Sequence, residues 1–563
     1  MISRRDFMQA TAAAAMATGL TGGMLGRAAA QGRLTQADIL RFPSLGNVTL
    51  VHLTDLHAQL VPLHYREPSW NLGVGEARGQ VPHLTGTDFL KHFKIAPGSA
   101  EAHALTDQDF AGLARTHGRM GGLDRIATIV KAIRAERGNR VMLLDGGDTW
   151  TNSWTSLQTK AADIVEVMNL LKPDAMTGHW EFTLGAERVE EIVKALPFPF
   201  LAQNVRDTDF EEKVFEPRQM FERGGVKIAV IGQAYPYTPI ANPRWMFPKW
   251  TMGIREDDVQ KQVDEAQAEG AQLVVLLSHN GFDMDRKMAG RVKGIDVILT
   301  SHTHDALPEA VTVGKTLLIA TGSHGKFVSR LDLDVQDKEI KGYQYRLIPV
   351  FSDAITPDAE MAALIAKHRA PFASDLSRVL GKTTGVLYRR GNFQGSLDDV
   401  FTDAMLQERD AEISLSPGVR WGASILPGQD ITFEDVTNAC AMTYPNCYRM
   451  QMTGARLKEV LEDVADNIFN PDPYFQGGGD MVRVGGMGFT IDPGKPIGSR
   501  ISGMTHLKTG QAIDASRSYT VAGWASVNEN TQGPPIWEVV EKFITARKVI
   551  EPRPLDAVKV VGA

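Results

Sequence analysis

From residue 48 onward the chain repeats one pattern: an apolar, β-branched run, a polar turn rich in Asp, His and Gly, and a stretch with helical spacing. The runs are VTLVHLTDLH, VMLLDGGDTW, DAMTGHWEF, KIAVIGQAY, LVVLLSHNG, VILTSHTHD and TLLIATGSHG. Strands that alternate with helices such as GLDRIATIVKAIRAERG (122–138) predict an α/β sandwich. The polar letters follow the carboxyl ends of the strands, the edge at which open α/β sheets build their sites.

The chain is long enough for more than one domain. A length of 563 residues exceeds what one hydrophobic core usually organises, so we expect two. The first spans 48–350 and is interrupted at 62–118 by a segment without periodicity, which is too long for an ordinary connection and predicts an insertion at the rim of the site. A helix-like linker at 351–380 leads to a second domain at 381–563, where new strands and glycine-rich turns begin.

The first thirty residues have the features of an export signal. Ser3-Arg4-Arg5-Asp6-Phe7-Met8 resembles the twin-arginine pattern, and a weakly apolar stretch ends in Ala28-Ala29-Ala30. We expect a signal peptide at 1–30 and a periplasmic mature protein; the other interpretation is an N-terminal helix with two solvated arginines. No later stretch is apolar enough to span a bilayer. The net charge is -7 and the sequence has no Lys/Arg block, so it gives no indication of a basic surface that would bind nucleic acid.

Two cysteines are too few for a disulfide scaffold or a thiolate metal site. Cys440 and Cys447 stand close together in NACAMTYPNC, so an oxidising compartment would allow one small-loop disulfide. The other interpretation, that both are buried and inert, is equally compatible with the sequence.

Potential metal ligands stand at these strand ends. An extended i, i+2 pair points both side chains to one side, so Asp-x-His and His-x-His can each present two ligands to one point. Carboxylate and imidazole suit Mn, Zn or Fe, and seven ligands exceed the need of one ion, so a shared carboxylate would bridge two. A single histidine of this kind would be interpreted as structural, and the series of turns carries the prediction. The seven residues are Asp55, His57, Asp148, His179, His279, His302 and His304.

The series TDLH, GGD, GHWE, SH and SHTH resembles the turns of the calcineurin-like metallophosphoesterases, specifically the 5′-nucleotidase branch, which read Asp-x-His, Gly-Asp, Gly-Asn-His-Glu, Ser-His and Gly-His-x-His. Ser301 stands where that branch usually has Gly, which leaves the ligand pair untouched. HGRMGGLDRIATIV and SPGVRWG (416–422) extend the resemblance over nearly all of the mature chain. It implies a metallophosphoesterase α/β sandwich followed by a 5′-nucleotidase-type C-terminal α/β domain. It also implies two ligand sets that share one carboxylate: Asp55, His57, Asp148 and His304 for one ion, and Asp148, His179, His279 and His302 for the other.

The turn TGHWEFTLG (177–185) departs from that pattern. His179 stands where the family has an Asn ligand, and imidazole nitrogen is the better transition-metal donor. Trp180 replaces the His that assists the leaving group, and an indole cannot usefully donate a proton. Thr183 stands where the nucleotidases keep an Asp to orient that His. A site without this acid suits a leaving group that departs unprotonated, such as sulfur. Trp180 could exclude water or only pack.

The motifs TDLHAQL, GHWEF, SHNGFDMD and TSHTHD, together with the leader, resemble the SoxB thiosulfohydrolases of periplasmic sulfur oxidation. This resemblance implies two manganese ions, with Zn or Fe as other fits, and a cysteine S-thiosulfonate on the SoxYZ carrier as the substrate. A metal-bridging hydroxide would attack the sulfonate sulfur, sulfate would leave, and the carrier would keep a persulfide. We expect a monomer that binds this carrier and neither nucleic acid nor membrane.

The second domain is expected to supply positive charge for the sulfonate. Arg420 in SPGVRWG resembles the Arg of the nucleotidase motif Asn-x-Gly-x-Arg, and Arg390 in LYRRGNF is a second candidate that its neighbour Arg389 makes ambiguous. The stretch FQGGGDMVRVGG (475–486), with Gly478 and Asp480, could admit a glycine-rich carrier arm or form only a tight turn. We assign catalytic roles to Asp148, Trp180 and Arg420, and substrate binding to Arg390, Arg420, Gly478 and Asp480.

Two other functions compete with this interpretation. A periplasmic 5′-nucleotidase or sugar-nucleotide phosphohydrolase would use the same metals, but it needs leaving-group help that Trp180 cannot give. A metal-free binding protein on a retired hydrolase scaffold is the third hypothesis, against which the intact set of ligands argues.

Overall fold

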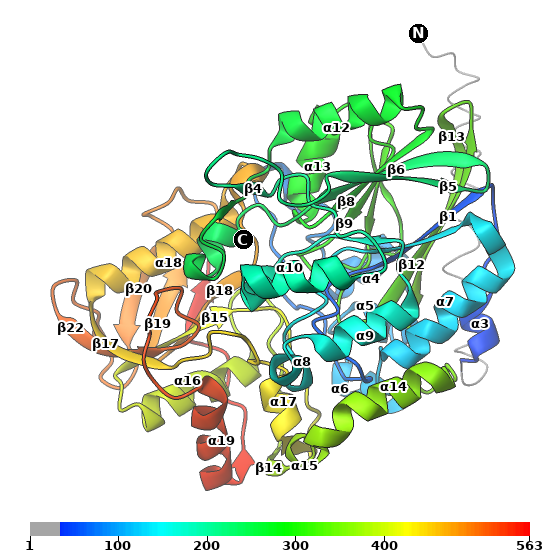
Figure 1. The fold of residues 1–563 in the computed structure, drawn as a ribbon. Coiled ribbons are helices and arrows are strands. Elements are labelled where there is room, and N and C mark those ends of the chain that lie inside the picture. Colours follow the sequence, from blue (N-terminus) through cyan, green and yellow to red (C-terminus); the bar gives the residue numbers. More distant parts are fainter. Residues whose placement is uncertain (1–33, 563) are drawn as a thin grey trace.

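The computed structural model describes residues 34–562, so the predicted signal peptide at 1–30 lies outside the described residues. Two β-sheets occupy the larger part of the molecule (Figure 1). The first has the strand order β13-β12-β1-β2-β3, and the second has the order β10-β11-β9-β8-β6-β5. Strands β1, β2 and β3 are parallel, and so are β6, β8, β9 and β11. Parallel strands end at a common edge, and this edge carries the candidate site in both sheets.

The inner strands of the two sheets are almost wholly buried. Those of the first sheet are β1 (Val48–Leu53), β2 (Val141–Asp145), β3 (Ala175–Met176), β12 (Phe327–Gln336) and β13 (Glu339–Pro349). Those of the second are β5 (Arg218–Arg223), β6 (Val226–Gln233), β8 (Leu273–Ser278), β9 (Val297–Thr300), β10 (Val311–Val313) and β11 (Thr316–Ala320). Strands β4 (Arg206–Asp207) and β7 (Trp250–Thr251), which come before β5 and after β6 in the chain, form a separate two-stranded antiparallel ribbon.

Strand β6 illustrates why its sequence is apolar without alternation. Ile228 and Val230 belong to the core shared with the first sheet, whereas Ala229 and Ile231 belong to the core shared with α12 (Glu256–Ala268) and α13 (Phe282–Arg291). Successive side chains of a strand point to opposite faces, so a strand covered on both faces needs apolar residues throughout. The arrangement confirms the predicted α/β sandwich.

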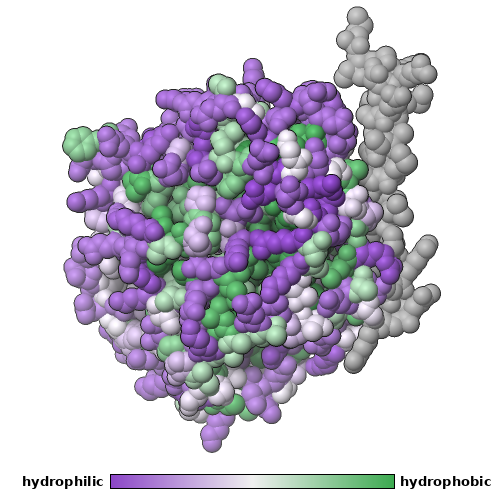
Figure 2. All heavy atoms as spheres, turned by 45° about the vertical axis from the view of Figure 1, so that its right-hand side comes forward, coloured by the Kyte–Doolittle hydropathy of each residue, from purple (hydrophilic) through white to green (hydrophobic). Residues whose placement is uncertain are grey.

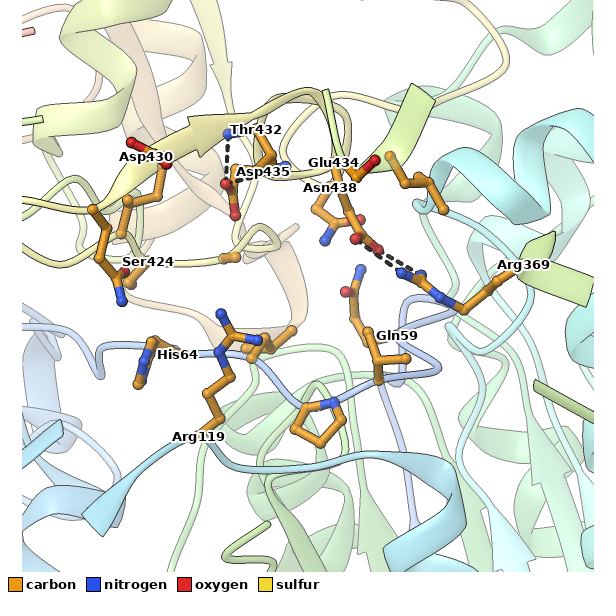
Figure 3. Close-up of a pocket in the computed structure, with 18 of the residues that line it drawn as sticks. Gln59, His64, Arg119, Arg369, Ser424, Asp430, Thr432, Glu434, Asp435 and Asn438 are labelled. Carbon is orange, nitrogen blue, oxygen red and sulfur yellow. Dashed lines mark hydrogen bonds and ion pairs between the residues drawn. The ribbon is translucent and has the colours of Figure 1, made fainter. Parts of the chain in front are cut away.

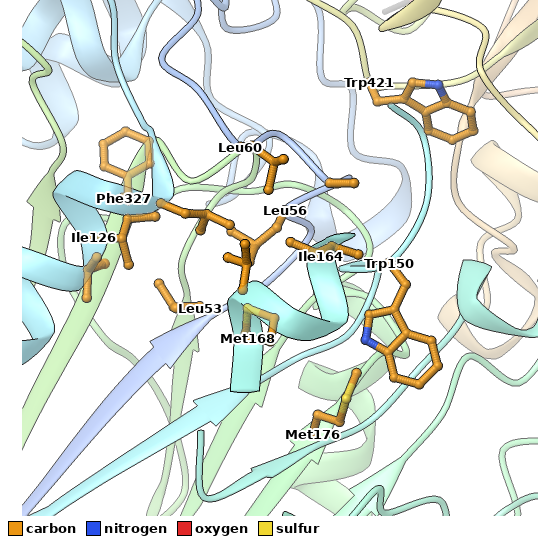
Figure 4. Close-up of a cluster of buried hydrophobic side chains, with 14 of the residues drawn as sticks. Leu53, Leu56, Leu60, Ile126, Trp150, Ile164, Met168, Met176, Phe327 and Trp421 are labelled. Carbon is orange, nitrogen blue, oxygen red and sulfur yellow. The ribbon is translucent and has the colours of Figure 1, made fainter. Parts of the chain in front are cut away.

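The first sheet is covered by α7 (Leu123–Arg137) and α9 (Ala162–Leu171). Figure 4 shows part of this core, in which Leu53 of β1 lies among Ile126 of α7 and Met168 of α9. Trp421, from the C-terminal part of the chain, belongs to the same cluster. The core therefore continues from the sandwich into the C-terminal part without a gap.

The C-terminal part lies to one side of the sandwich, in yellow to red in Figure 1. Its sheets have the orders β17-β22-β15-β18, β21-β20-β19-β24 and β16-β14-β23, and α16 (Ser396–Glu408), α18 (Gly454–Phe469) and α19 (Ile536–Arg547) pack on them. The strands are β14 (Val379–Thr383), β15 (Ile413–Gly418), β16 (Asp430–Thr432), β17 (Tyr448–Thr453), β18 (Asp480–Gly485), β19 (Met487–Ile491), β20 (Ile501–His506), β21 (Gln511–Ala512), β22 (Ser518–Gly523), β23 (Val549–Ile550) and β24 (Val558–Val560).

Helices α14 (Ala359–Arg369) and α15 (Ala373–Leu376) connect the two parts. Helix α14 begins where the Asp358 side chain accepts the Met361 backbone N–H, and it packs on α7 and α9. The short helix α17 (Phe433–Thr437) begins with a capping box between Thr432 and Asp435.

The segment predicted as an insertion (62–118) contains α4 (Gly86–His92), α5 (Ala100–Leu105) and α6 (Phe110–His117), which its sequence pattern did not indicate. It binds both parts of the molecule. The Tyr65 hydroxyl donates to the Arg420 carbonyl at 2.6 Å, and the Asn392 backbone N–H donates to the Trp70 carbonyl at 3.1 Å. On the other side, the buried Lys326 ammonium donates to the Ala104 carbonyl at 2.9 Å and pairs with Glu67. The segment therefore fastens the C-terminal part to the sandwich.

Hydrophilic side chains cover most of the face in Figure 2, with hydrophobic ones in the spaces between them. Among residues 34–562, no helix has both the length and the apolar character that crossing a membrane requires. Cys440 and Cys447 are buried free thiols, which is the second of the two arrangements that the sequence left open.

Candidate metal centre

The seven predicted metal ligands stand on turns that follow five parallel strands. Asp55 and His57 follow β1, Asp148 follows β2 and His179 follows β3, all in the first sheet. His279 follows β8, and the pair at 302 and 304 follows β9, in the second sheet. Because the carboxyl ends of these strands meet, the turns converge at the edge shared by the two sheets.

The structure brings these side chains together in two groups. We call Asp55, His57, Asp148 and His304 group 1, and Asp148, His179, His279 and His302 group 2. Within each group the ligand atoms lie within 4.8 Å of one another, so each could hold a metal ion. The memberships are the two ligand sets implied by the sequence resemblance, including Asp148 as the shared member.

The backbone of these turns adopts a conformation that is unfavourable for residues with a side chain. Asp55, His57, Asp148, His302 and His304 have φ angles of 50°, 49°, 55°, 73° and 59°. Such left-handed positions outside glycine cost roughly 1–3 kcal/mol each, and they cluster at functional sites. Backbone bonds from His57 N–H to the Asp148 carbonyl (2.8 Å) and from Asp55 N–H to the Gly147 carbonyl (2.9 Å) hold two of the turns together.

The hydrogen bonds of the imidazoles fit cation binding. His57 Nδ1 donates to Asn152 Oδ1 at 3.2 Å, and His279 Nδ1 donates to the Gly146 carbonyl at 2.6 Å. In the neutral form of each ring, this bond places the proton on Nδ1, so that Nε2 carries the lone pair with which it could bind a cation. His57 Nε2 lies 2.9 Å from His304 Nε2, and His279 Nε2 lies 3.1 Å from Asp148 Oδ2. Ring nitrogens that converge on each other and on a carboxylate are a donor set that suits Mn, Zn or Fe.

Burial sets the charges of the carboxylates in the absence of cations. It raises the pKa of Asp55 to about 8. Burial also raises the pKa of Asp148, but the imidazoles of His179 and His279 outweigh this effect and lower it well below its ordinary value. For His279, burial lowers the pKa and the Asp148 carboxylate more than reverses this, so the pKa is about 10. The cluster therefore holds protons near neutral pH that divalent cations would displace.

The unusual turn after β3 forms one wall of the centre. The Trp180 backbone N–H donates to Asp148 Oδ1 at 2.8 Å, and the indole packs at 4.8 Å between ring centroids on Trp421. Thr183 Oγ1 donates to the Trp180 carbonyl at 2.7 Å and is 2% exposed, so it is engaged by the turn itself. Trp180, Trp421 and Tyr235 line a cavity of about 140 Å³ that also contains His57 and Asp148.

The predicted substrate-binding residues of the C-terminal part differ in whether they line this cavity. Arg420 and Gly478 line it, but the Arg420 guanidinium donates to the Gly479 carbonyl (2.6 Å), the Thr303 carbonyl (2.9 Å) and Asp480 Oδ1 (3.2 Å). Arg390 is 2% exposed, donates to the Thr303 carbonyl at 3.0 Å and stands outside the cavity lining. Asp480 is buried, which raises its pKa, but the guanidinium groups of Arg420 and Arg483 lower it below the usual range.

Several residues of the centre were missed by the sequence analysis. Asn152 orients His57, and Glu181 accepts the backbone N–H groups of Thr149 and His179, both at 2.7 Å. Tyr235 and Trp421 line the cavity. Tyr235 follows β6, one of the apolar runs identified from the sequence, and its position after a strand was the available signal. Tyrosine is not among the residue types that usually bind these cations, so this position did not stand out.

A larger cavity, of about 730 Å³, lies between the sandwich, the connecting helices and the C-terminal part (Figure 3). His64 and Arg119 face Asp430 and Asp435 across it. None of the seven predicted metal ligands lines this cavity.

Comparisons with known proteins agree with this architecture. Residues 379–538 match the family model described as 5′-nucleotidase, C-terminal domain. The 5′-nucleotidase of Rattus norvegicus is 25% identical over 420 residues, which are 66% of this chain and 70% of that protein. The structure of a 5′-nucleotidase precursor from Thermus thermophilus has a TM-score of 0.72 at 22% identity and covers 92% of this chain and 100% of its own.

The fold and the C-terminal domain thus define a hydrolase of the 5′-nucleotidase and metallophosphoesterase superfamily. The sulfate thiohydrolase SoxB of Thermus thermophilus, solved in complex with glycerol, is more similar: it has a TM-score of 0.89 and 34% identity, with 93% of this chain and 98% of that chain covered. The chain belongs to the SoxB family.

Residues 1–21 match the model for the TAT (twin-arginine translocation) pathway signal sequence. The protein is therefore directed to the periplasm, as its first residues predicted.

Proposed function

We propose that this hydrolase removes the terminal sulfonate from a cysteine S-thiosulfonate on the glycine-rich arm of the SoxYZ carrier, in periplasmic thiosulfate oxidation. Water adds to the sulfonate sulfur, and the bond between that sulfur and the neighbouring sulfane sulfur breaks. The electron pair stays on the sulfane sulfur. The products are sulfate, a cysteine persulfide anion on the carrier and two protons.

The observation that carries this proposal is that an indole, that of Trp180, lines the cavity beside Asp148. Trp180 occupies the turn position at which the related nucleotidases have a proton donor, and its indole faces Trp421 and the cavity. An alkoxide leaving group needs a proton in the transition state, whereas a persulfide anion is a much weaker base and leaves without one. An aromatic wall also keeps bulk water away from the reacting sulfur.

The two groups of Asp and His residues fit two divalent cations, for which manganese is our proposal. Such ions, when bound, supply an activated water molecule at neutral pH and neutralise oxyanion charge. Asp148 is the shared ligand, and its Oδ1 is fixed by the Trp180 backbone N–H at 2.8 Å. The ligand position and the aromatic wall are therefore set by one turn.

Arg420 lines the cavity as a buried cation, and we propose that its positive charge offsets the charge of the sulfonate. Its three hydrogen bonds to protein acceptors support a guanidinium that is held in one orientation rather than one that is free to bind the sulfonate with all its N–H groups. The Gly477–Gly479 backbone also lines the cavity, and we propose that it lies alongside the carrier arm.

A periplasmic 5′-nucleotidase or sugar-nucleotide phosphohydrolase is the second candidate. It is favoured by the match of residues 379–538 to the nucleotidase C-terminal domain. The two candidates share the metal chemistry and differ in the leaving group.

The experiment supplies the metal-loaded protein with a carrier-arm peptide charged with thiosulfonate and, separately, with AMP. We expect sulfate from the peptide and no phosphate from AMP. Phosphate release without sulfate release would reject the proposal in favour of the second candidate. Elemental analysis on the same sample tests the metal-free alternative, which requires less than one metal ion per chain.

A further inference from the structure

Tyr235 is buried beside group 2 and has no role in the reaction described above. It follows β6, is 2% exposed, and its backbone N–H donates at 3.1 Å to the carbonyl of Gly178. Gly178 directly precedes His179. The tyrosine is therefore anchored to the turn that carries one ligand of group 2.

The Tyr235 ring contacts two imidazoles of the same group. Its centroid lies 4.2 Å from that of His179, with a tilt of 49°, and 4.2 Å from that of His302, with a near-parallel angle of 28°. The imidazoles of group 1, His57 and His304, instead contact each other at 4.9 Å. Stacked rings restrict each other's rotation, so Tyr235 restricts two donors of one group only.

The Tyr235 hydroxyl extends this restraint to the glycine segment. It donates to the Gly477 carbonyl, and the same carbonyl accepts His302 Nε2 at 3.1 Å. A carbonyl oxygen has two lone pairs and can accept both bonds. With Nε2 protonated and used in this way, Nδ1 is the nitrogen of His302 that remains for a metal ion.

The contact between this segment and the imidazole is close. A Cβ placed on Gly478 would lie 2.5 Å from His302 Nε2, and Gly478 has a φ of 68°. The segment can approach the ligand only because it has no side chain here. Tyr235, His302 and Gly477–Gly478 therefore form one packed unit.

We propose that Tyr235 is a positioning residue: its ring fixes His302 as an Nδ1 donor of group 2, and its hydroxyl holds the glycine segment over that group. This inference rests on the proposal that the two groups bind cations. Loss of the ring lowers the affinity of the group 2 ion and leaves the group 1 ion unchanged.

The test compares Tyr235→Leu and Tyr235→Phe with Tyr237→Phe. Tyr237 is a matched control, because its hydroxyl also bonds the same C-terminal segment, at the Tyr474 carbonyl, while its ring lies next to Tyr235 rather than to a predicted ligand. Full-length chelator-treated proteins are titrated with Mn²⁺ alone, and the ions are followed by calorimetry and by electron paramagnetic resonance, which separates a coupled pair from a single ion.

We expect Tyr235→Leu to bind the first ion normally and the second about 10–100-fold more weakly, as for residues that orient a metal ligand. Its spectrum at two equivalents should be that of a single ion. Tyr235→Phe, which keeps the ring, should weaken the second ion by only about fivefold, the worth of one hydrogen bond. Tyr237→Phe should match the wild type.

Equal weakening of both ions, or a Tyr235→Phe variant that behaves like Tyr237→Phe, would overturn the inference. The second comparison holds even if Tyr235→Leu does not fold. A wild type that binds fewer than two Mn²⁺ ions would instead reject the proposed function, so the two failures are distinguishable.

Discussion

The glycine segment offers a pair of substitutions that differ in one contact. Gly478→Ala and Gly479→Ala each add a methyl group at a positive φ, of 68° and 80°, and each should cost about 1 kcal/mol of backbone strain. At position 479 the nearest heavy atom to the new carbon is 3.8 Å away, in ordinary contact. At position 478 the new carbon would lie 2.5 Å from His302 Nε2.

The size of the displacement determines the expected effect. Ordinary contact begins at 3.4 Å, so the imidazole or the segment must move by about 0.9 Å. Metal–ligand distances tolerate only about 0.2 Å. We therefore expect Gly478→Ala to weaken the group 2 ion by roughly 10–100-fold, or about 1.4–2.7 kcal/mol, and Gly479→Ala to leave it unchanged.

Mn²⁺ titration calorimetry on the chelator-treated proteins measures this difference, and urea denaturation of the same metal-free samples checks that both variants have lost similar stability. The reasoning fails if the two variants bind the second ion equally well, because then residue 478 does not restrain His302.

Three other predictions concern the acid position, a buried ion pair and a buried histidine. The double variant Trp180→His/Thr183→Asp restores an imidazole proton donor. It should release phosphate from alkyl phosphate esters about 100–10,000-fold faster than the wild type, as measured by a phosphate assay. An unchanged rate in a metal-loaded, folded variant would contradict the role assigned to the indole. Lys326→Met leaves the buried Glu67 carboxylate unpaired and should lower the free energy of unfolding by about 3–5 kcal/mol in urea, with part of the loss recovered in Lys326→Met/Glu67→Gln. Burial, together with the Lys326 charge, lowers the pKa of His103 to about 3. The imidazole therefore stays neutral in the folded protein, whereas in the unfolded chain it binds a proton below about pH 6.5. The contribution of His103 to the free energy of unfolding is therefore complete above pH 6.5 and is lost as the pH falls towards 3. In His103→Gln, the free energy of unfolding should decline less steeply between pH 6 and pH 4, as measured by urea denaturation. A slope identical to that of the wild type would exclude His103 as a cause of acid denaturation.

The class of fold and the positions of the candidate metal ligands could be predicted from the sequence for the same physical reason, whereas their division into two groups was implied only by the family resemblance. A buried parallel strand needs a continuous apolar run, and the turn after it reaches the active edge, so Asp55, Asp148 and His279 are marked by their positions. Burial on both faces, as in β6, makes the signal strong because almost every residue of the strand is constrained.

Features that depend on which partner a side chain reaches could not be predicted. Arg420 was predicted to bind the sulfonate, and the structure places it in the cavity lining. The sequence could not reveal that Thr303, Gly479 and Asp480 already accept its hydrogen bonds. Tyr235 is an unremarkable residue in the sequence, because its role comes from two imidazoles contributed by other strands. The helices of 62–118 were missed because they have only 7, 6 and 8 residues, too few turns for a clear helical periodicity.

The order in which the ribosome makes these parts would affect which ions the proposed metal centre takes up. All the donors are present once residue 304 has emerged, yet Gly477, whose carbonyl closes over His302, comes more than a hundred residues later. During that interval a nascent chain would present open imidazoles to whatever cations the cytosol supplies. Because a twin-arginine leader exports its cargo already folded, we expect metal choice to be made at synthesis and preserved across the inner membrane, beyond the reach of periplasmic competitors.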